Sequence, residues 1–110
     1  LVLDAEHAPF DRAALDLCVL AARAAGMAVL VRPPVAEPHH ILNALDLGAD
    51  GVLLPHIRSV AEAEAAARAC RHGAGGRGYA GSPRAGNYGS LGMARTLADA
   101  RHVAVIAQIE

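Results

Sequence analysis

Four short apolar runs, each followed directly by polar or charged residues, constrain the fold of this chain more than any other feature. The runs are Leu1–Leu3, Met27–Val31, Gly51–Leu54 and Val103–Ala107. Helical patterns separate them, and continuous apolar runs of this length are typical of parallel strands buried on both faces. The order therefore predicts successive βα units, and with them an α/β fold built on a parallel sheet.

The polar residues that follow these runs are expected to meet at one edge of the sheet. Because parallel strands point the same way, their carboxyl ends share a rim, where α/β barrels and open α/β sheets place their active sites. We call the side chains predicted there the rim cluster. Its members are Asp4, Glu6, His7, Arg32, His56, Gln108 and Glu110.

The length of 110 residues limits how much of a barrel the chain can form. A complete TIM (β/α)₈ barrel takes roughly 250 residues, so about four βα units amount to half of one. The chain starts inside a strand without an initiator Met, and it stops just after the last run. We therefore expect residues 1–110 to be a single partial barrel domain that is truncated at both ends and has two unpaired sheet edges.

Charge and composition argue against nucleic-acid and membrane partners. A net charge of −1 gives no electrostatic attraction for either, and one Phe, two Tyr and no Trp offer no platform for base stacking. No apolar run approaches the roughly 18 residues of a membrane span. Cys18 and Cys70 match no metal or redox spacing, so we expect small buried side chains in a reducing cytoplasm.

Start and stop signals predict the helices between the runs. Asp11 is expected to cap a helix that ends at Gly26, and Glu37 or Pro38 opens a second helix that ends at Gly48. Ser59 to Glu62 fits a capping box. The buried stripe expected for the third helix consists of Val60, Ala63, Ala67 and Cys70.

A Gly-rich segment, Gly73–Gly92, is expected to form a long loop before a short helix at Met93–Ala100. We predict that this loop lies at the rim, as a lid or against a neighbouring subunit. Residues 73–78 formally match G-x-G-x-x-G, but a helix rather than a strand precedes them, so we predict no dinucleotide site.

The residue types in the rim cluster fit acid–base and metal chemistry, with simpler structural alternatives left open. His7 can act as a general base whose tautomer Asp4 holds, or it can be an ordinary hydrogen-bonded histidine. Arg32 can bind a carboxylate or a developing enolate oxygen, or form a structural ion pair. Glu110 can be a ligand of Mg²⁺ or Mn²⁺, or a partner of Arg32.

Five segments in the right order resemble the HpcH/HpaI aldolase/citrate lyase family, and they extend over essentially the whole chain. They are Asp4–Pro9, Val31–Pro34, Gly48–Pro55, Arg77-Gly78 and Gln108–Glu110. The resemblance is strongest to the metal-dependent class II pyruvate aldolases of the 4-hydroxy-2-oxoheptanedioate and 2-keto-3-deoxy sugar-acid types. It implies a (β/α)₈ barrel, usually hexameric, that cleaves a 4-hydroxy-2-oxo acid to pyruvate and an aldehyde.

The same resemblance implies a role for each of five residues. Glu110 would be a ligand of a divalent metal, Mg²⁺, Mn²⁺ or Co²⁺, and Gln108 would contact the substrate from the same strand. His7 would be the catalytic base, acting through metal-bound water, with Asp4 as its partner. Arg32 would steady the enolate oxygen of pyruvate. Glu6 belongs to the motif, but we assign it no chemical step.

The family pattern also includes a second metal-binding Asp and a Gly-Pro turn after a later strand, which residues 1–110 do not contain. We therefore expect this fragment to be impaired in catalysis. Alternative readings are a lyase acting on a CoA thioester of the citrate or citramalyl type, which the Lys-free sequence does not support, and a non-catalytic truncated barrel module. An isomerase or a carboxylating enzyme with the same enolate chemistry is a further alternative.

Overall fold

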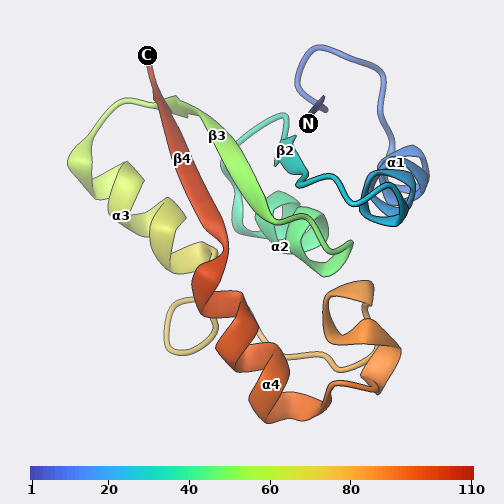
Figure 1. Cartoon of the computed structure of the whole chain (residues 1–110). Coiled ribbons are helices and arrows are strands. Elements are labelled where there is room, and N and C mark those ends of the chain that lie inside the picture. Colours follow the sequence, from blue (N-terminus) through green and yellow to red (C-terminus); the bar gives the residue numbers. More distant parts are fainter.

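A computed structural model describes residues 1–110 as a four-stranded parallel sheet with helices packed on one of its faces (Figure 1). The strands lie side by side in chain order, β1-β2-β3-β4. This arrangement confirms the predicted α/β fold and the partial barrel of four parallel strands. The elements are β1 Val2–Asp4, α1 Arg12–Ala24, β2 Leu30–Arg32, α2 Pro38–Asp46, β3 Gly51–Ile57, α3 Val60–Ala69, the 3₁₀ helix η1 Arg84–Gly89, α4 Gly92–Asp99, the 3₁₀ helix η2 Ala100–His102, and β4 Ala104–Ile109.

The hydrophobic core lies between the sheet and helices α1, α2 and α3. Val31, Val52 and Leu54 point into it from the strands and are almost fully buried. The other face of the sheet is open, since Val2 and Ile106 are 49% and 44% exposed. The apolar runs predicted strands buried on both faces, but residues 1–110 supply helices for one face only. None of the helices is long and apolar enough to cross a membrane.

The predicted signals at the ends of α1 and α2 are confirmed. An Asp11 side-chain oxygen accepts a hydrogen bond from the Ala14 backbone N–H at 2.7 Å, and Gly26 adopts a positive φ of 70° after the last turn. Glu37 occupies the N-cap of α2 and Pro38 its first turn, where no backbone N–H is needed. Cys70 is buried in the core, as expected, whereas Cys18 packs against the core and is only partly buried.

The start of α3 follows the prediction only in part. The Ser59 hydroxyl accepts the Glu62 backbone N–H at 3.1 Å, but the Glu62 carboxylate accepts the N–H of Arg58 rather than that of Ser59. The predicted stripe was wrong for two of its members, because Val60 is 76% exposed and Ala67 is also exposed. The buried residues of this alanine-rich helix and its C-cap are Ala66, Ala69 and Cys70.

Strand β3 is longer than the sequence predicts. The predicted apolar run stops at Leu54, yet the strand continues to Ile57 through an irregularity in the pairing between Leu54 and Ile57. A bulge leaves residues outside the regular pattern of strand-to-strand hydrogen bonds. The missing N–H of Pro55 therefore removes no such hydrogen bond at this position. The neighbouring His56 adopts a φ of 59°, in the left-handed region.

The Gly-rich segment lies at the opposite end of the sheet from the rim, so its prediction as a rim loop was wrong. The segment connects a helix to the next strand, and such connections lie at the amino ends of parallel strands. Figure 1 shows it with α4 at the end of β4 that is remote from the C-terminus. Arg84 fixes it there by donating hydrogen bonds to the backbone oxygens of Asp16 and Leu47, at 3.1 and 2.9 Å.

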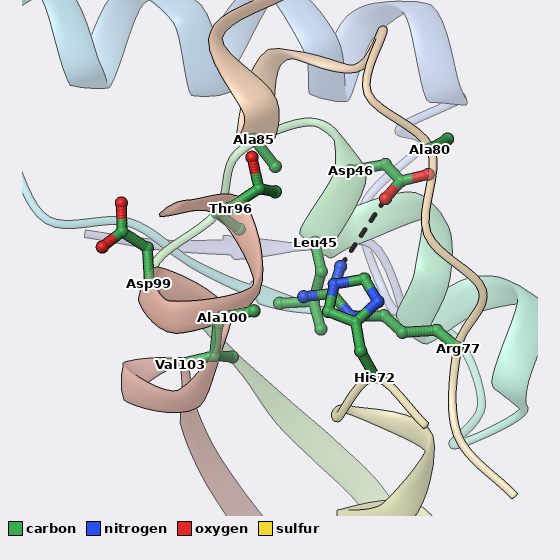
Figure 2. Close-up of a pocket in the computed structure, with 11 residues that line it drawn as sticks. Leu45, Asp46, His72, Arg77, Ala80, Ala85, Thr96, Asp99, Ala100 and Val103 are labelled. Atoms are coloured by element: carbon green, nitrogen blue, oxygen red, sulfur yellow. Dashed lines mark ion pairs between the residues drawn. The ribbon is translucent and has the colours of Figure 1, made fainter. Parts of the chain in front are cut away.

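Residues of this segment help to line a small pocket of about 90 Å³ near the starts of β3 and β4 (Figure 2). Ala49 and Val103, which precede the two strands, line it together with Arg77. The Arg77 side chain is only 5% exposed, and its Nη1 lies 3.6 Å from Asp46 Oδ1. Desolvation lowers the pKa of Arg77 and raises that of Asp46. The pair therefore ties the Gly-rich segment to the end of α2.

Gly51→Ala is expected to destabilise the fold, because an added Cβ would lie 2.4 Å from the Ala104 carbonyl oxygen and 2.8 Å from Leu30 Cδ2. Neither the Ala104 backbone nor the packed Leu30 side chain can move away without disturbing the sheet. We therefore expect the free energy of unfolding to fall by about 1–3 kcal/mol. Urea denaturation followed by circular dichroism measures it. The matched control is Gly78→Ala, whose Cβ would meet no atom within 4 Å and which should change stability by less than about 1 kcal/mol. Equal stability of both variants would contradict the packing described here.

Candidate active site

Arg32 and Asp4 form a two-pronged ion pair where β1 and β2 end. The two residues are direct neighbours in the parallel register. Arg32 Nε donates to Asp4 Oδ1 at 2.9 Å, and Nη2 donates to Oδ2 at 2.6 Å. The hydrogen bonds from Arg32 hold the pKa of Asp4 well below its usual range. The ionised carboxylate therefore fixes the plane of the guanidinium group at the rim.

Asp4 also shapes the turn that carries His7. Its Oδ1 accepts the backbone N–H groups of Glu6 and His7, at 3.0 and 3.2 Å. The imidazole of His7 makes no contact with Asp4; its Nε2 lies 3.7 Å from Glu6 Oε1, and the side chain is 70% exposed. The expected contact between Asp4 and the His7 ring is therefore absent, because Arg32 occupies both oxygens of the Asp4 carboxylate.

Glu6 is the most buried side chain of the rim cluster, with 9% of it exposed. Its Oε1 lies 2.8 Å from His56 Nε2. Its Oε2 lies 3.3 Å from Arg32 Nη1, although no hydrogen bond of favourable geometry forms. The sequence motif predicts Glu6 at the rim, without a chemical step for it. Its position shows that it separates Arg32 from His56.

His56 links the two outer strands of the sheet across the rim. While its Nε2 faces Glu6 after β1, its Nδ1 lies 2.9 Å from Oε2 of Glu110, which follows β4. A neutral imidazole carries only one N–H, so both contacts are hydrogen bonds only when the ring is protonated or shares a carboxyl proton. The sequence placed His56 at the rim, but the bulge that turns it toward both carboxylates left no recognisable signal.

Gln108 completes a closed ring of contacts. Arg32 Nη1 donates to Gln108 Oε1 at 3.4 Å, and Gln108 Nε2 donates to Glu110 Oε1. The ring thus passes through side chains that leave all four strands. In order, its members are Arg32, Glu6, His56, Glu110 and Gln108. The structure therefore brings together every residue predicted at the rim, with Asp4 and His7 attached at the side of β1.

Among the carboxylates at the rim, one is suited to be a ligand of a hard divalent cation. Together with the adjoining Asp4, the ring brings three carboxylates, those of Asp4, Glu6 and Glu110, against the single guanidinium of Arg32, a formal balance of −2 with His56 neutral. Glu110 is the most accessible of these carboxylates, with 36% of its side chain exposed. Residues 1–110 contain no group of three or more His, Cys, Asp or Glu side chains arranged to hold a metal. Glu110 alone therefore matches a single carboxylate ligand and not a complete shell.

Comparison with known proteins covers the whole chain. The chain is 33% identical over 113 residues to the hydroxypyruvate/pyruvate aldolase of Roseobacter denitrificans. It is 33% identical over 111 residues to the 5-keto-4-deoxy-D-glucarate aldolase of Escherichia coli. Each alignment includes all of this chain and 43% of the relative, so the chain spans less than half the length of these relatives.

The fold is also similar to that of a solved structure, an HpcH/HpaI aldolase/citrate lyase family protein from Burkholderia cenocepacia. The TM-score is 0.91 at 34% identity, over 100% of this chain and 45% of the other. The model of the HpcH/HpaI aldolase/citrate lyase family matches residues 1–110. Since this match includes every residue, the chain belongs to the HpcH/HpaI aldolase/citrate lyase family.

Proposed function

We propose that the protein is a carbon–carbon lyase that cleaves a 4-hydroxy-2-oxo acid to pyruvate and an aldehyde. The observation that carries this proposal is the closed ring at the rim. The ring holds the guanidinium of Arg32 and the accessible carboxylate of Glu110, and the exposed imidazole of His7 lies next to the ring member Glu6. The names of the two curated relatives, both aldolases, favour aldol cleavage over a lyase acting on a CoA thioester.

Arg32 is suited to hold the oxygen that becomes an enolate. Its Nε and Nη2 are committed to Asp4, whereas Nη1 has only long contacts, 3.3 Å to Glu6 and 3.4 Å to Gln108. A substrate oxygen can displace the weaker of these contacts at little cost. Because the guanidinium is already oriented, it stabilises negative charge on the 2-oxo oxygen without reorganisation during the reaction.

His7 is suited to move the proton that triggers cleavage. Removal of the proton from the 4-hydroxyl group lets the C3–C4 bond break, with its electron pair passing to C3 and the 2-oxo oxygen. The aldehyde leaves, and protonation of C3 completes pyruvate. His7 projects from the Asp4 turn with most of its ring accessible, and histidine exchanges protons readily near neutral pH. The Asp4 carboxylate supports both residues, because it accepts the backbone N–H of His7 and the side-chain N–H groups of Arg32.

We propose that Glu110 is one ligand of a divalent cation, Mg²⁺, Mn²⁺ or Co²⁺. Such a cation, when bound, would supply positive charge that stabilises the enolate. The negative balance of the ring and the accessibility of Glu110 support this assignment. Gln108, which holds one Glu110 oxygen, is placed to contact the same substrate. With a single carboxylate ligand, residues 1–110 by themselves are expected to be impaired in cleavage.

We further propose that the working protein is a homo-oligomer, a hexamer as the resemblance implies, acting in the cytoplasm on small 2-oxo acids and aldehydes. We propose no nucleic-acid or membrane partner, consistent with the net charge of −1. The open face of the sheet, where Val2 and Ile106 are half exposed, supports further packing in the working form.

The first test is exchange of the methyl protons of pyruvate in D₂O, followed by NMR with Mg²⁺ or Co²⁺ present. Exchange needs enolate formation but no aldehyde, so it isolates the proposed chemistry. We expect exchange above the rate of buffer, and its loss on addition of EDTA. His7→Ala should slow it by roughly 10²–10⁴-fold, as expected for loss of a general base. His102→Ala, an exposed histidine at the other end of β4, is the matched control. Unchanged exchange in the His7→Ala protein would remove His7 from the mechanism.

Arg32→Lys tests the role of the guanidinium in the same assay. Lysine keeps the charge but cannot bind Asp4 and a substrate oxygen at the same time. We expect a fall of roughly 10²–10³-fold in the exchange rate at saturating pyruvate, the usual effect of removing one donor to a developing oxyanion. The control is Arg95→Lys, which alters an exposed ion pair with Asp99 on α4. If both variants exchange protons at the wild-type rate, Arg32 has only a structural role.

A further inference from the structure

We propose that His56 is a positioning residue that orients Glu110 for the divalent cation by bridging it to Glu6. This inference rests on the proposed function, since it takes Glu110 as a cation ligand. Nothing in the aldolase chemistry described above requires a histidine at this place.

The backbone holds His56 in a conformation that an L-residue with a bulky side chain rarely adopts. Its φ of 59° falls in the left-handed region. Pro55 and Ile57 on either side are buried, and Ile57 also pairs with Ile109 of β4. The packed neighbours therefore impose the bulge, and the bulge turns His56 toward the rim.

The two contacts of His56 span the rim between strands that are not neighbours. Glu6 follows β1 at one edge of the sheet and Glu110 follows β4 at the other. The imidazole nitrogens lie close to both carboxylates, with Nε2 at 2.8 Å from Glu6 Oε1 and Nδ1 at 2.9 Å from Glu110 Oε2. Glu6 is itself nearly buried, so it gives His56 a fixed support.

Glu110 needs such support because it lies just beyond the last strand. Its backbone N–H donates to the Ile57 carbonyl at 3.3 Å, which places it beside the bulge. His56 then holds Oε2, while Gln108 holds Oε1. A carboxylate fixed in this way pays less ordering cost when it binds a cation, which is how outer partners of metal ligands raise affinity.

The test is a titration of the purified protein with Mn²⁺, in which electron paramagnetic resonance measures the free ion. His56→Asn and His56→Gly are the variants, because asparagine and glycine both tolerate the left-handed backbone. We expect Mn²⁺ to bind roughly 10–100-fold more weakly to both, the usual effect of losing an outer partner. Thermal melts should show both variants folded. Added imidazole should restore binding to the His56→Gly protein, which mere relief of backbone strain would not do.

His102→Asn is the matched control and should bind Mn²⁺ like the wild type, while Glu110→Gln should lose binding. Wild-type affinity in both His56 variants, with Glu110→Gln still defective, would overturn the role of His56 and leave the proposed cation site intact. Wild-type affinity in the Glu110→Gln protein, or no Mn²⁺ binding by the folded wild type, would overturn the cation assignment and the His56 inference with it.

Discussion

Parallel pairing in chain order brings residues from both ends of the sequence to one edge of the sheet. The register sets Asp4 beside Arg32, and the two-pronged ion pair between them holds the ends of β1 and β2 together. Strands β3 and β4 add the remaining side chains at the same edge. Without this alignment the charged side chains would lie apart and could not contact one another.

The closed ring is better understood as a device for orientation than as a source of stability. Partly exposed ion pairs contribute little to folding, and the ring leaves an excess of negative charge. Its effect is to give each functional group a fixed partner. Asp4 orients Arg32, while Glu6 lies against both Arg32 and His56. Glu110 is held from two sides and remains accessible. Such a site would suit a cation and an anionic substrate bound together, as the enolate chemistry we propose requires.

The sequence predicted the features that depend on local chemistry and on strand direction. Capping at Asp11, the proline start of α2 and the membership of the rim cluster are confirmed. Features that depend on which of several side chains binds a given group were not predicted. Both Arg32 and His7 were available to the Asp4 carboxylate, and the in-register guanidinium took both of its oxygens. In the alanine-rich α3, residues of equal size gave no contrast between faces, so the buried stripe was misplaced.

Two further errors have a physical origin in the backbone. The apolar run stops before Pro55, but a bulge lets the strand continue past this proline without its missing N–H, and the same bulge turns His56 toward the site. The Gly-rich segment was placed at the rim by its composition. Its position between α3 and β4 required the opposite end of the sheet, where Arg77 and Arg84 now anchor it.

The most direct test of the account is a crystal structure of the protein with Mn²⁺ and pyruvate, with anomalous scattering used to locate the metal. The account predicts an anomalous peak within bonding distance of the Glu110 carboxylate, and pyruvate with its 2-oxo oxygen toward Arg32 Nη1. A metal or pyruvate bound at the other end of the sheet, in the cavity lined by Arg77 and Asp46, would contradict it.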